Sequence, residues 1–401
     1  MKILQLCHKP PFPLLDGGCI AMNNIAAGLM KQGHEVKVIA ISTPKHPVND
    51  LEAFKFYREQ THFESVFVDT TITFMGLIKS FFKNESYHIS RFNSKQFHQK
   101  LIELLTQNSF DIVQIESIFM TPYINTIRTY SNAKIVIRLH NIEHQIWQRL
   151  IQNEPNLLKR ITLKWLSSTL KKYELSIFKK IDGFMAISSV DYHFFNQKNP
   201  NIKGKIIPFG IDVEDYKADD NYIPSDIPEL FHIGSMNWPP NIEGIEWFIE
   251  DVWPLILGQY PSITFTIAGK NIPDRFYIKN NENFNVIGEV PDAKQFMLSK
   301  DVMIVPLLSG SGIRIKIIEG MALGKTIITT SIGAEGLDIS DGVNIFIANT
   351  PHEFLEKITQ CVKSPEICKI IGENAKNYVA LHHHNNTISN EIISFYNALL
   401  N

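Results

Sequence analysis

Long hydrophobic runs are absent from this 401-residue sequence. No stretch approaches the roughly 18 uninterrupted apolar residues of a membrane-spanning helix, so we expect no helix that crosses a bilayer. The first residues, MKILQLCHKPPFP, form a short apolar run that prolines interrupt. They lack the apolar core and the small-residue cleavage site of a signal peptide, and they predict a first β-strand instead.

Cysteine is scarce, and its spacing excludes a disulfide framework or a zinc site. The four cysteines, Cys7, Cys19, Cys361 and Cys368, form no CxxC pair and no metal-ligand pattern. Free thiols fit a reducing compartment better than an oxidising one. We therefore expect a cytoplasmic protein.

An excess of charge of one sign is also absent. The formal net charge is -2 and the pI is about 6.7, so the chain as a whole has no positive field for nucleic acid. Any anion must be bound locally. No G-x-G-x-x-G motif follows the first strand, which argues against a conventional NAD or FAD site.

Strand-like and helix-like segments alternate along the chain. Lys2–Cys7 predicts the first strand, and a helical pattern over Ile20–Gln32 ends at Gly33. Such alternation predicts an α/β fold with parallel sheets and helices on both faces. At about 150 residues per domain we expect two domains, joined near residues 205–210. Further strand candidates are Val36–Ile41, Asp111–Ile115, Lys134–Leu139, Gly183–Ala186, Ile206–Pro208, Glu229–Ile233, Thr264–Ala268, Phe284–Ile287, Val302–Val305, Thr326–Thr329 and Asn344–Ile347.

The segment Pro306–Leu337 predicts an anion site. After the apolar run VMIVP comes Ser-Gly-Ser-Gly, which includes Ser311 and Gly312 and allows backbone amides to approach a ligand. A helix is predicted to begin near Ile313. Its unpaired N–H groups and the positive end of its dipole are suited to a diphosphate.

Three charged residues of this helix extend the prediction. Arg314 and Lys316 supply full positive charges for the diphosphate. Glu319, three residues after Lys316, lies on roughly the same face and is suited to accept hydrogen bonds from ribose hydroxyls. The alternative is a buried strand followed by a surface helix whose basic residues are merely solvated.

Motifs over nearly the whole chain resemble the retaining glycosyltransferases of family 4, which have the GT-B fold. The resemblance implies two Rossmann-like domains with parallel sheets that face each other across a cleft. It assigns residues 1–207 to the acceptor side and residues 208–385 to the nucleotide-sugar donor. Apolar residues at helical spacing predict a C-terminal helix over 386–401, which packs back on the first domain or on the second. The motifs are the Gly17-Gly18 loop, RLHNIEH at 138–144, AISS at 186–189, IPFGID at 207–212, FHIGSMNWPPN at 231–241, IGEVPD at 287–292 and the Arg-x-Lys-x-x-Glu segment with TTSIGAEGL.

Two positions depart from the common pattern of that family. The family carries two glutamates eight positions apart, but here Ser311 stands at the first position and Glu319 at the second. The usual acidic contact to the donor hexose is therefore missing. Many members also take basic phosphate ligands from a G-R-x-x-x-x-K-G stretch, where this chain has GSMNWPPNIEG. Arg314 and Lys316 are the natural substitutes.

Several glycines are expected around the donor. Gly17 and Gly18 allow the loop backbone of the first domain to approach the phosphate closely. Gly234 opens the second domain in the matching motif. The segment from Gly288 to Val290 is expected to contact the base, through backbone groups that distinguish uracil from guanine. Ordinary turn glycines are the alternative for Gly17 and Gly18.

The first domain offers a facing group of polar residues. His140 ends the run KIVIRLH, where a parallel sheet presents a side chain to ligands. The family position assigns it to the transferred sugar or the acceptor, and a structural histidine is the alternative. Asn141 and Glu143 follow on the acceptor side. Glu143 is suited to orient an acceptor hydroxyl, or it is a surface carboxylate at a helix start.

The function implied by the resemblance is transfer of a hexose from a nucleoside diphosphate sugar, UDP- or GDP-linked, to a hydroxyl acceptor with retention. A carbohydrate or lipid-linked acceptor in bacterial polysaccharide, lipopolysaccharide or glycolipid synthesis is expected, with no cofactor and no metal. Two rivals stay open, a catalytically silent sugar-nucleotide-binding subunit and a sugar-nucleotide epimerase or hydrolase of the same fold.

Two further segments carry weaker signals. Leu158–Lys180 interleaves lysines with apolar residues. It is a solvated basic face over a packed one, or a helix that rests on the anionic inner face of a membrane. The run His382, His383 and His384 suggests a metal, but consecutive residues diverge in direction, and we expect no metal there.

Overall fold

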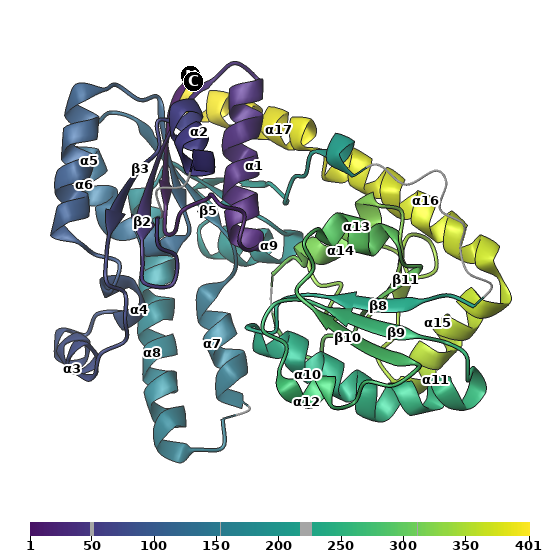
Figure 1. Ribbon diagram of the computed structural model, residues 1–401. Coiled ribbons are helices and arrows are strands. Elements are labelled where there is room, and N and C mark those ends of the chain that lie inside the picture. Colours follow the sequence, from purple (N-terminus) through teal and green to yellow (C-terminus); the bar gives the residue numbers. More distant parts are fainter. Residues whose placement is uncertain (49–51, 153, 217–226, 311) are drawn as a thin grey trace. The chain divides into compact units, whose positions relative to one another are not determined.

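The computed structural model describes residues 1–48, 52–152, 154–216, 227–310 and 312–401. It contains two compact units (Figure 1). Met1–Gly210 together with Asn385–Asn401 form the first unit, and Ile211–His384 form the second. These limits lie close to the sequence boundaries at 207/208 and 385/386. The last segment of the chain belongs to the first unit.

The first unit is built on a parallel sheet whose strands follow the order β3-β2-β1-β4-β5-β6-β7. All its described pairings are parallel, so the carboxyl ends of the strands lie at one edge. The strands are β1 (Lys2–Cys7), β2 (Glu35–Ser42), β3 (Glu64–Phe67), β4 (Ile112–Glu116), β5 (Lys134–Leu139), β6 (Gly183–Ala186) and β7 (Lys203–Ile206).

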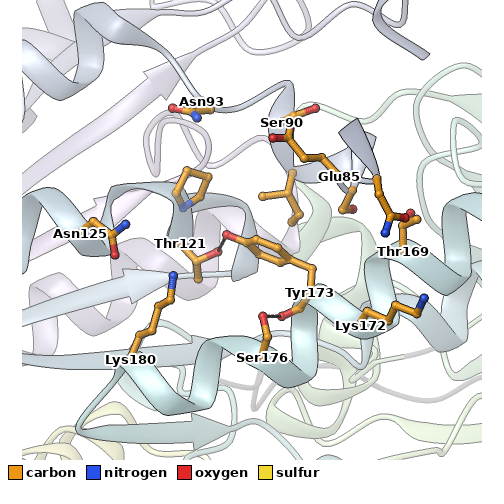
Figure 2. Close-up of a pocket in the computed structure, with 14 residues that line it drawn as sticks. Glu85, Ser90, Asn93, Thr121, Asn125, Thr169, Lys172, Tyr173, Ser176 and Lys180 are labelled. Carbon is orange, nitrogen blue, oxygen red and sulfur yellow. Dashed lines mark hydrogen bonds between the residues drawn. The ribbon is translucent and has the colours of Figure 1, made fainter. Parts of the chain in front are cut away.

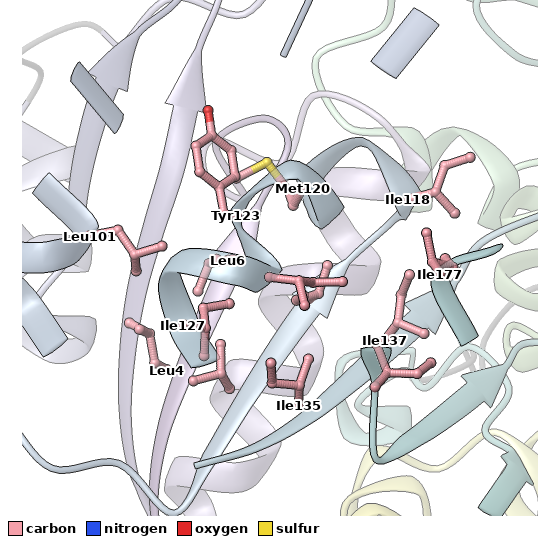
Figure 3. Packing of buried hydrophobic residues seen from close by; sticks show 14 of the residues in the cluster. Leu4, Leu6, Leu101, Ile118, Met120, Tyr123, Ile127, Ile135, Ile137 and Ile177 are labelled. Atoms are coloured by element: carbon pink, nitrogen blue, oxygen red, sulfur yellow. The ribbon is translucent and has the colours of Figure 1, made fainter. Parts of the chain in front are cut away.

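Helices cover both faces of this sheet, because successive strand side chains point to opposite sides. Leu4 and Leu6 pack on one face with residues of α5, η1 and α6 (Figure 3), whereas Ile3 packs on the other with α1 and α17. The helices are α1 (Gly17–Lys31), α2 (Glu52–Thr61), α3 (Phe74–Lys83), α4 (Tyr87–Ser90), α5 (Lys95–Gln107), η1 (Ile118–Tyr123), α6 (Ile124–Tyr130), α7 (Glu143–Gln152), α8 (Leu157–Ser176), η2 (Ile177–Lys180), α9 (Ser189–Lys198) and α17 (Asn385–Leu400).

Helix α17 packs closely against α1, as Figure 1 shows. A Cβ placed on Gly28 of α1 would lie 2.1 Å from Oγ of Ser389, so the glycine sets the approach of the two helices. The side-chain amide of Asn385 donates to the backbone carbonyl of Asn24 over 3.0 Å. The Tyr396 hydroxyl donates to Oε1 of Gln114 in β4. The final helix therefore completes the core of the first unit.

The second unit has a second parallel sheet, in the order β10-β9-β8-β11-β12-β13. Its core joins Phe265 and Ile304 of the sheet to Phe248 and Phe354 of the covering helices. The elements are η3 (Val213–Asp215), β8 (Leu230–Ile233), α10 (Pro239–Trp247), the π-turn η4 (Phe248–Val252), α11 (Trp253–Gln259), β9 (Phe265–Ala268), α12 (Asp274–Tyr277), β10 (Phe284–Gly288), α13 (Ala293–Leu298), β11 (Val302–Val305), α14 (Ile315–Ala322), β12 (Thr326–Thr329), β13 (Phe346–Ile347), α15 (Pro351–Lys363) and α16 (Pro365–His382).

The α/β architecture of two Rossmann-like domains is confirmed by these two sheets. Some element limits differ from the sequence predictions. The first long helix begins at Gly17 rather than Ile20, because the Asp16 side chain caps it by accepting from the amide of Cys19. In the part of the chain that the structure describes, no helix is both long and apolar enough to cross a membrane.

Candidate active site

The loop after β11 in the second unit brings backbone amides and charges to the carboxyl edge of the sheet. Gly310 and Gly312 have φ angles of 108° and 81°, a conformation that side chains other than glycine adopt only with strain. Helix α14 then begins after Arg314, two residues later than predicted for Ile313. Ser311, expected to bind the donor, lies outside the described residues. The loop has the form expected of an anion site.

Lys316 is held by two side chains from the neighbouring strand and helix. Its ammonium donates to Oδ1 of Asn241 over 2.8 Å, and it lies 3.3 Å from Nε2 of His232. Nδ1 of His232 donates to the carbonyl of Ile304, so Nε2 is the acceptor in the tautomer that these contacts assign. A Cβ on Gly234 would lie 2.8 Å from the Lys316 nitrogen. The glycine at this position therefore leaves room for the cation.

The surroundings of Lys316 disfavour its charged form. Burial and then the positive charge of Arg314 lower the pKa of Lys316 to about 7. The pKa of His232 lies well below its usual value, because the imidazole is buried beside Lys316. An anion bound at this place would favour the ammonium and relieve the repulsion between the two cations.

Arg314 is almost fully buried, at 4% exposure, and organises the loop. Its guanidinium donates to the carbonyls of Gly312 and Ile332. It also lies 5.2 Å from the centre of the Trp238 ring, within the range of a cation–π contact. Arg314 thus combines a positive charge near the start of α14 with a structural role in the glycine loop.

Glu319 is placed one turn further along α14. Its Oε1 accepts a hydrogen bond of 2.9 Å from the hydroxyl of Tyr216. Burial raises the pKa of Glu319, and the Tyr216 hydrogen bond and the charge of Lys294 partly oppose this. The Lys294 ammonium lies 4.1 Å from the centre of the Tyr216 ring. One carboxylate oxygen is therefore held by Tyr216, which fixes the direction of the other.

The residues predicted to contact the base lie at the same edge of the sheet. Gly288 ends β10 with a φ of 80°, and its carbonyl accepts from the amide of Gly269 over 2.7 Å. Val290 follows, half-buried, after the exposed Glu289. Gly234 directly follows β8 and Gly288 ends β10, so in this parallel sheet both lie at the edge where the α14 loop begins.

In the first unit, Gly17 and Gly18 form the first turn of α1. They follow Asp16, whose pKa lies well below its usual range because hydrogen bonds from His46 and Lys9 outweigh its burial. The Lys9 ammonium donates to both carboxylate oxygens of Asp16 over 2.6 Å. This ion pair holds the carboxylate of Asp16 at the start of α1. A Cβ on Gly18 would meet the Lys9 nitrogen at 2.9 Å.

His140 donates through Nε2 to Oε2 of Glu116 over 2.8 Å. Glu116 is fully buried at the end of β4, and it also accepts from the side-chain amide of Gln5 over 2.8 Å. Burial would raise the pKa of Glu116, but the His140 hydrogen bond and the Arg138 charge lower it to about 2. An ionised Glu116 fixes the tautomer of His140, so that Nδ1 is the lone-pair nitrogen.

A second imidazole lies beside His140. The rings of His8 and His140 meet edge to face with centroids 5.9 Å apart. Burial and the nearby charge of Lys9 lower the pKa of His8 to about 3. Burial also lowers the pKa of His140, although the Glu116 hydrogen bond acts in the opposite direction. Burial therefore disfavours the charged form of both imidazoles.

The acceptor-side residues Asn141 and Glu143 begin helix α7. The amide of Glu143 donates to Oε1 of Glu174, which is fully buried in α8 and caps the helix. Burial, followed by the charge of Glu174, raises the pKa of Glu143 to about 8, and a hydrogen bond from Asn141 opposes the shift. Glu143 is therefore a carboxylic acid near neutral pH rather than an ordinary surface carboxylate.

The first unit has a pocket of about 450 Å³. Figure 2 shows the side chains that line it. None of the residues predicted to bind the donor or acceptor lines it. Its walls include Asn93, Asn125 and Tyr173, whose hydroxyl lies 2.8 Å from Oγ1 of Thr121. The pocket shares no lining residue with the group around His140. The sequence patterns do not predict this pocket.

Sequence reasoning missed the partners of the residues that it found. His232, Asn241 and Trp238 all lie in or beside the motif FHIGSMNWPPN, which was a signal for a site but not for these roles. Tyr216 lies 103 positions from its partner Glu319, and Glu116 lies 24 positions from His140. Only the folded sheet brings these pairs together.

Comparison with known proteins supports one functional class for both units. Residues 17–215 match the family described as Glycosyltransferase Family 4, and residues 227–364 match Glycosyl transferases group 1. The chain is 24% identical over 388 residues to a 44.6 kDa protein in the cps region of Klebsiella pneumoniae, with 94% of this chain and 95% of that protein covered.

Solved structures share the fold at low identity. Sucrose-phosphate synthase from Thermosynechococcus elongatus superimposes with a TM-score of 0.72 at 13% identity, covering 100% of this chain and 99% of that one. Anabaena HepE in complex with UDP gives a TM-score of 0.66 at 17% identity, with 99% and 100% covered. The two parallel sheets, the glycine loop at α14 and these matches lead to one assignment. The chain is a glycosyltransferase with the GT-B fold.

Proposed function

We propose that the protein transfers a hexose from a nucleoside diphosphate sugar to a hydroxyl acceptor, with retention of anomeric configuration. The observation that carries the proposal is the pair Arg314 and Lys316 at the start of α14, beside a glycine loop at the carboxyl edge of a parallel sheet. Helix termini and cations of this kind bind diphosphates. The glycosyltransferase matches and the UDP-bound HepE structure support the donor class.

The second unit is proposed to stabilise the departing diphosphate. As the bond from the anomeric carbon to the phosphate oxygen breaks, negative charge grows on the diphosphate. Lys316 and the N–H groups before α14 are fixed in advance by Asn241, Gly310 and Gly312, so little reorganisation is needed. These cations supply the charge stabilisation themselves, and we propose a reaction that requires no metal ion.

Glu319, Gly288 and Val290 are proposed to hold the nucleoside. The oxygen of Glu319 that Tyr216 leaves available is suited to a ribose hydroxyl. Backbone groups from Gly288 to Val290 are suited to a uracil or guanine edge. In the first unit, the amides of Gly17 and Gly18 at the start of α1 are proposed to approach the donor phosphate.

His140 is proposed to contact the transferred sugar. Because its Nε2 donates to Glu116, its Nδ1 accepts a hydrogen bond from a sugar hydroxyl. Asn141 and Glu143 are proposed to orient the acceptor, a carbohydrate or a lipid-linked glycan. The relative in the Klebsiella cps region supports polysaccharide synthesis, and four free thiols support a cytoplasmic location.

A two-step experiment tests this function. A thermal-shift screen of UDP-, GDP-, ADP- and CDP-sugars first identifies the donor, since a ligand of the folded state raises its stability. Release of the nucleoside diphosphate is then measured with and without candidate acceptors, and the product anomer is assigned by NMR. We expect acceptor-dependent release and a retained anomer. Donor binding without turnover would indicate the silent subunit, and free or epimerised sugar would indicate the other rival.

A further inference from the structure

The first unit exposes an apolar surface on α3 and on the first turns of α8. We call it the α3–α8 surface. Phe82 is 82% exposed, Phe74 is 76% exposed and Leu158 is 78% exposed. Large apolar side chains exposed singly are ordinary, but a group of them on adjacent helices marks an interaction site. The surface consists of Phe74, Met75, Phe81, Phe82, Leu157, Leu158 and Ile161.

Direct contact joins the two helices of this surface. The rings of Phe81 in α3 and Trp165 in α8 have centroids 5.4 Å apart. Leu158 and Ile161 precede Trp165 by seven and four residues, so they share its face of α8. The apolar groups of α3 therefore continue onto α8, in the region where α8 extends away from the sheet in Figure 1.

Packing within the first unit does not account for these side chains. Leu166 and Leu170, further along α8, are buried, whereas Leu157, Leu158 and Ile161 are exposed. The expectation of a packed apolar face thus holds for the later part of α8 and not for its beginning. In α3, Ser80 is the buried residue. The side chain of Thr73 nevertheless caps the helix, and the backbone amide of Thr73 donates to the hydroxyl of Tyr87. These two contacts hold the start of α3 in place.

Basic residues predominate within the two segments that carry the surface. Residues 70–84 and 155–173 contain seven basic residues and no aspartate or glutamate, although the whole chain has a net charge of -2. Lys79, Lys83 and Lys164 are exposed and form no ion pair with any residue that the structure describes. Acidic residues lie only at the edges of these segments, where Glu154 pairs with Lys159 over 2.6 Å. Apolar side chains beside unpaired lysines are complementary to the interface of an anionic bilayer.

We propose that the α3–α8 surface docks the protein on an anionic lipid bilayer. The aromatic side chains of α3 and the leucines of α8 enter the interface, and the lysines contact lipid phosphates. Insertion of apolar side chains and electrostatic attraction of the lysines act together, because either of them alone gives only weak binding to a membrane. This docking does not depend on the proposed donor site, and it holds the first unit near acceptors that are carried by lipids.

Vesicle sedimentation of the full chain tests the proposal. We expect at least tenfold more binding to phosphatidylglycerol vesicles than to phosphatidylcholine vesicles, with a large decrease in 0.5 M salt because ions screen the lysines. The double variant Phe74→Ser/Phe82→Ser should bind at least tenfold less. The matched control is Ile278→Ser/Leu381→Ser, which changes side chains 83% and 70% exposed in the second unit and should bind normally.

A charge variant completes the design. Lys79→Gln/Lys83→Gln should lose binding to anionic vesicles, whereas Lys369→Gln/Lys376→Gln on α16 should not. The proposal is overturned if wild-type protein ignores anionic vesicles or if the phenylalanine variant binds as well as wild type. Self-association in sedimentation velocity that the phenylalanine variant removes, without vesicle binding, would assign the surface to a second copy instead. Nucleotide-sugar binding, measured without vesicles, reports separately on the proposed function.

Discussion

At the scale of single residues, Lys316 is a cation in surroundings that favour its neutral form. Its pKa of about 7 in the ligand-free protein means that it loses its proton within the physiological range. A bound diphosphate raises this pKa, so binding above pH 7 requires uptake of a proton. Below pH 7 the lysine is charged in both states, and affinity reaches a plateau.

The first prediction is that affinity for the nucleotide sugar falls as pH rises through 7, by up to tenfold per pH unit. Calorimetry at pH 6.5 and 8.5, in buffers of different ionisation heat, measures both the affinity and the proton uptake. A nucleotide sugar is the suitable ligand because its diphosphate does not titrate here. Lys316→Met should bind more weakly at pH 6.5 and lose the pH dependence. If affinity depended on pH equally in the wild-type protein and in Lys316→Met, the titrating group would be a residue other than Lys316.

The second prediction concerns His140. His140→Ala should retain most of its affinity for the nucleoside diphosphate but lose at least tenfold in acceptor-dependent transfer, with kcat and kcat/KM falling together. Glu116→Gln should also slow transfer, because the neutral amide no longer fixes the imidazole tautomer. His193→Ala, an exposed histidine on α9, is the matched control. Normal turnover in a folded His140 variant would leave the histidine a structural role.

The site was predictable from sequence only in part. Arg314 precedes α14 directly, and Lys316 and Glu319 lie within it. Their short spacing in sequence was enough to predict that they lie close together. Their partners Asn241 and Tyr216 come from other elements, and a single sequence contains no measure of those distances.

At the scale of elements, the close contact of α1 with α17 is possible because Gly28 has no side chain. The third prediction is that Gly28→Ala lowers the free energy of unfolding by about 1–3 kcal/mol, the usual cost of overpacking. Its Cβ must displace the buried Ser389 hydroxyl, which donates to the carbonyl of Asn385. Thermal or urea denaturation measures the change.

Two further variants make this test specific. Gly258→Ala in α11 meets no atom within 4 Å and should be neutral or stabilising. Ser389→Ala added to Gly28→Ala should recover part of the loss, because the clashing oxygen is gone. If Gly28→Ala and Gly258→Ala had equal effects, helix propensity rather than the contact of α1 with α17 would explain both.

The elements that sequence patterns missed or displaced lie at the edge of a sheet. β3, with the sequence ESVF, and β7, with the sequence KGKI, are edge strands with mostly half-buried or exposed residues, so they lack the apolar run that revealed the central strands. Between α10 and α11 the helical path is interrupted by the π-turn η4. Periodicity predicts helical content there but not a change of pitch.

At the scale of the whole molecule, the two units differ in how the chain builds them. The second unit is one continuous segment with its own core. The fourth prediction is that Ile211–His384 produced alone folds cooperatively, whereas Met1–Gly210 alone does not, because α17 no longer covers Met22, Ile25 and Leu29 of α1. Circular dichroism during heating distinguishes these outcomes, and cooperative melting of Met1–Gly210 would contradict the prediction.

The return of the chain to the first unit has a consequence for biosynthesis. The ribosome makes Asn385–Asn401 only after the entire second unit, so the first unit stays incomplete for roughly ten seconds or more at about 5–20 residues per second. During that interval the apolar face of α1 is uncovered and open to chaperones or to other nascent chains. A message truncated before the last helix would therefore yield a product with a finished second unit and an aggregation-prone first one.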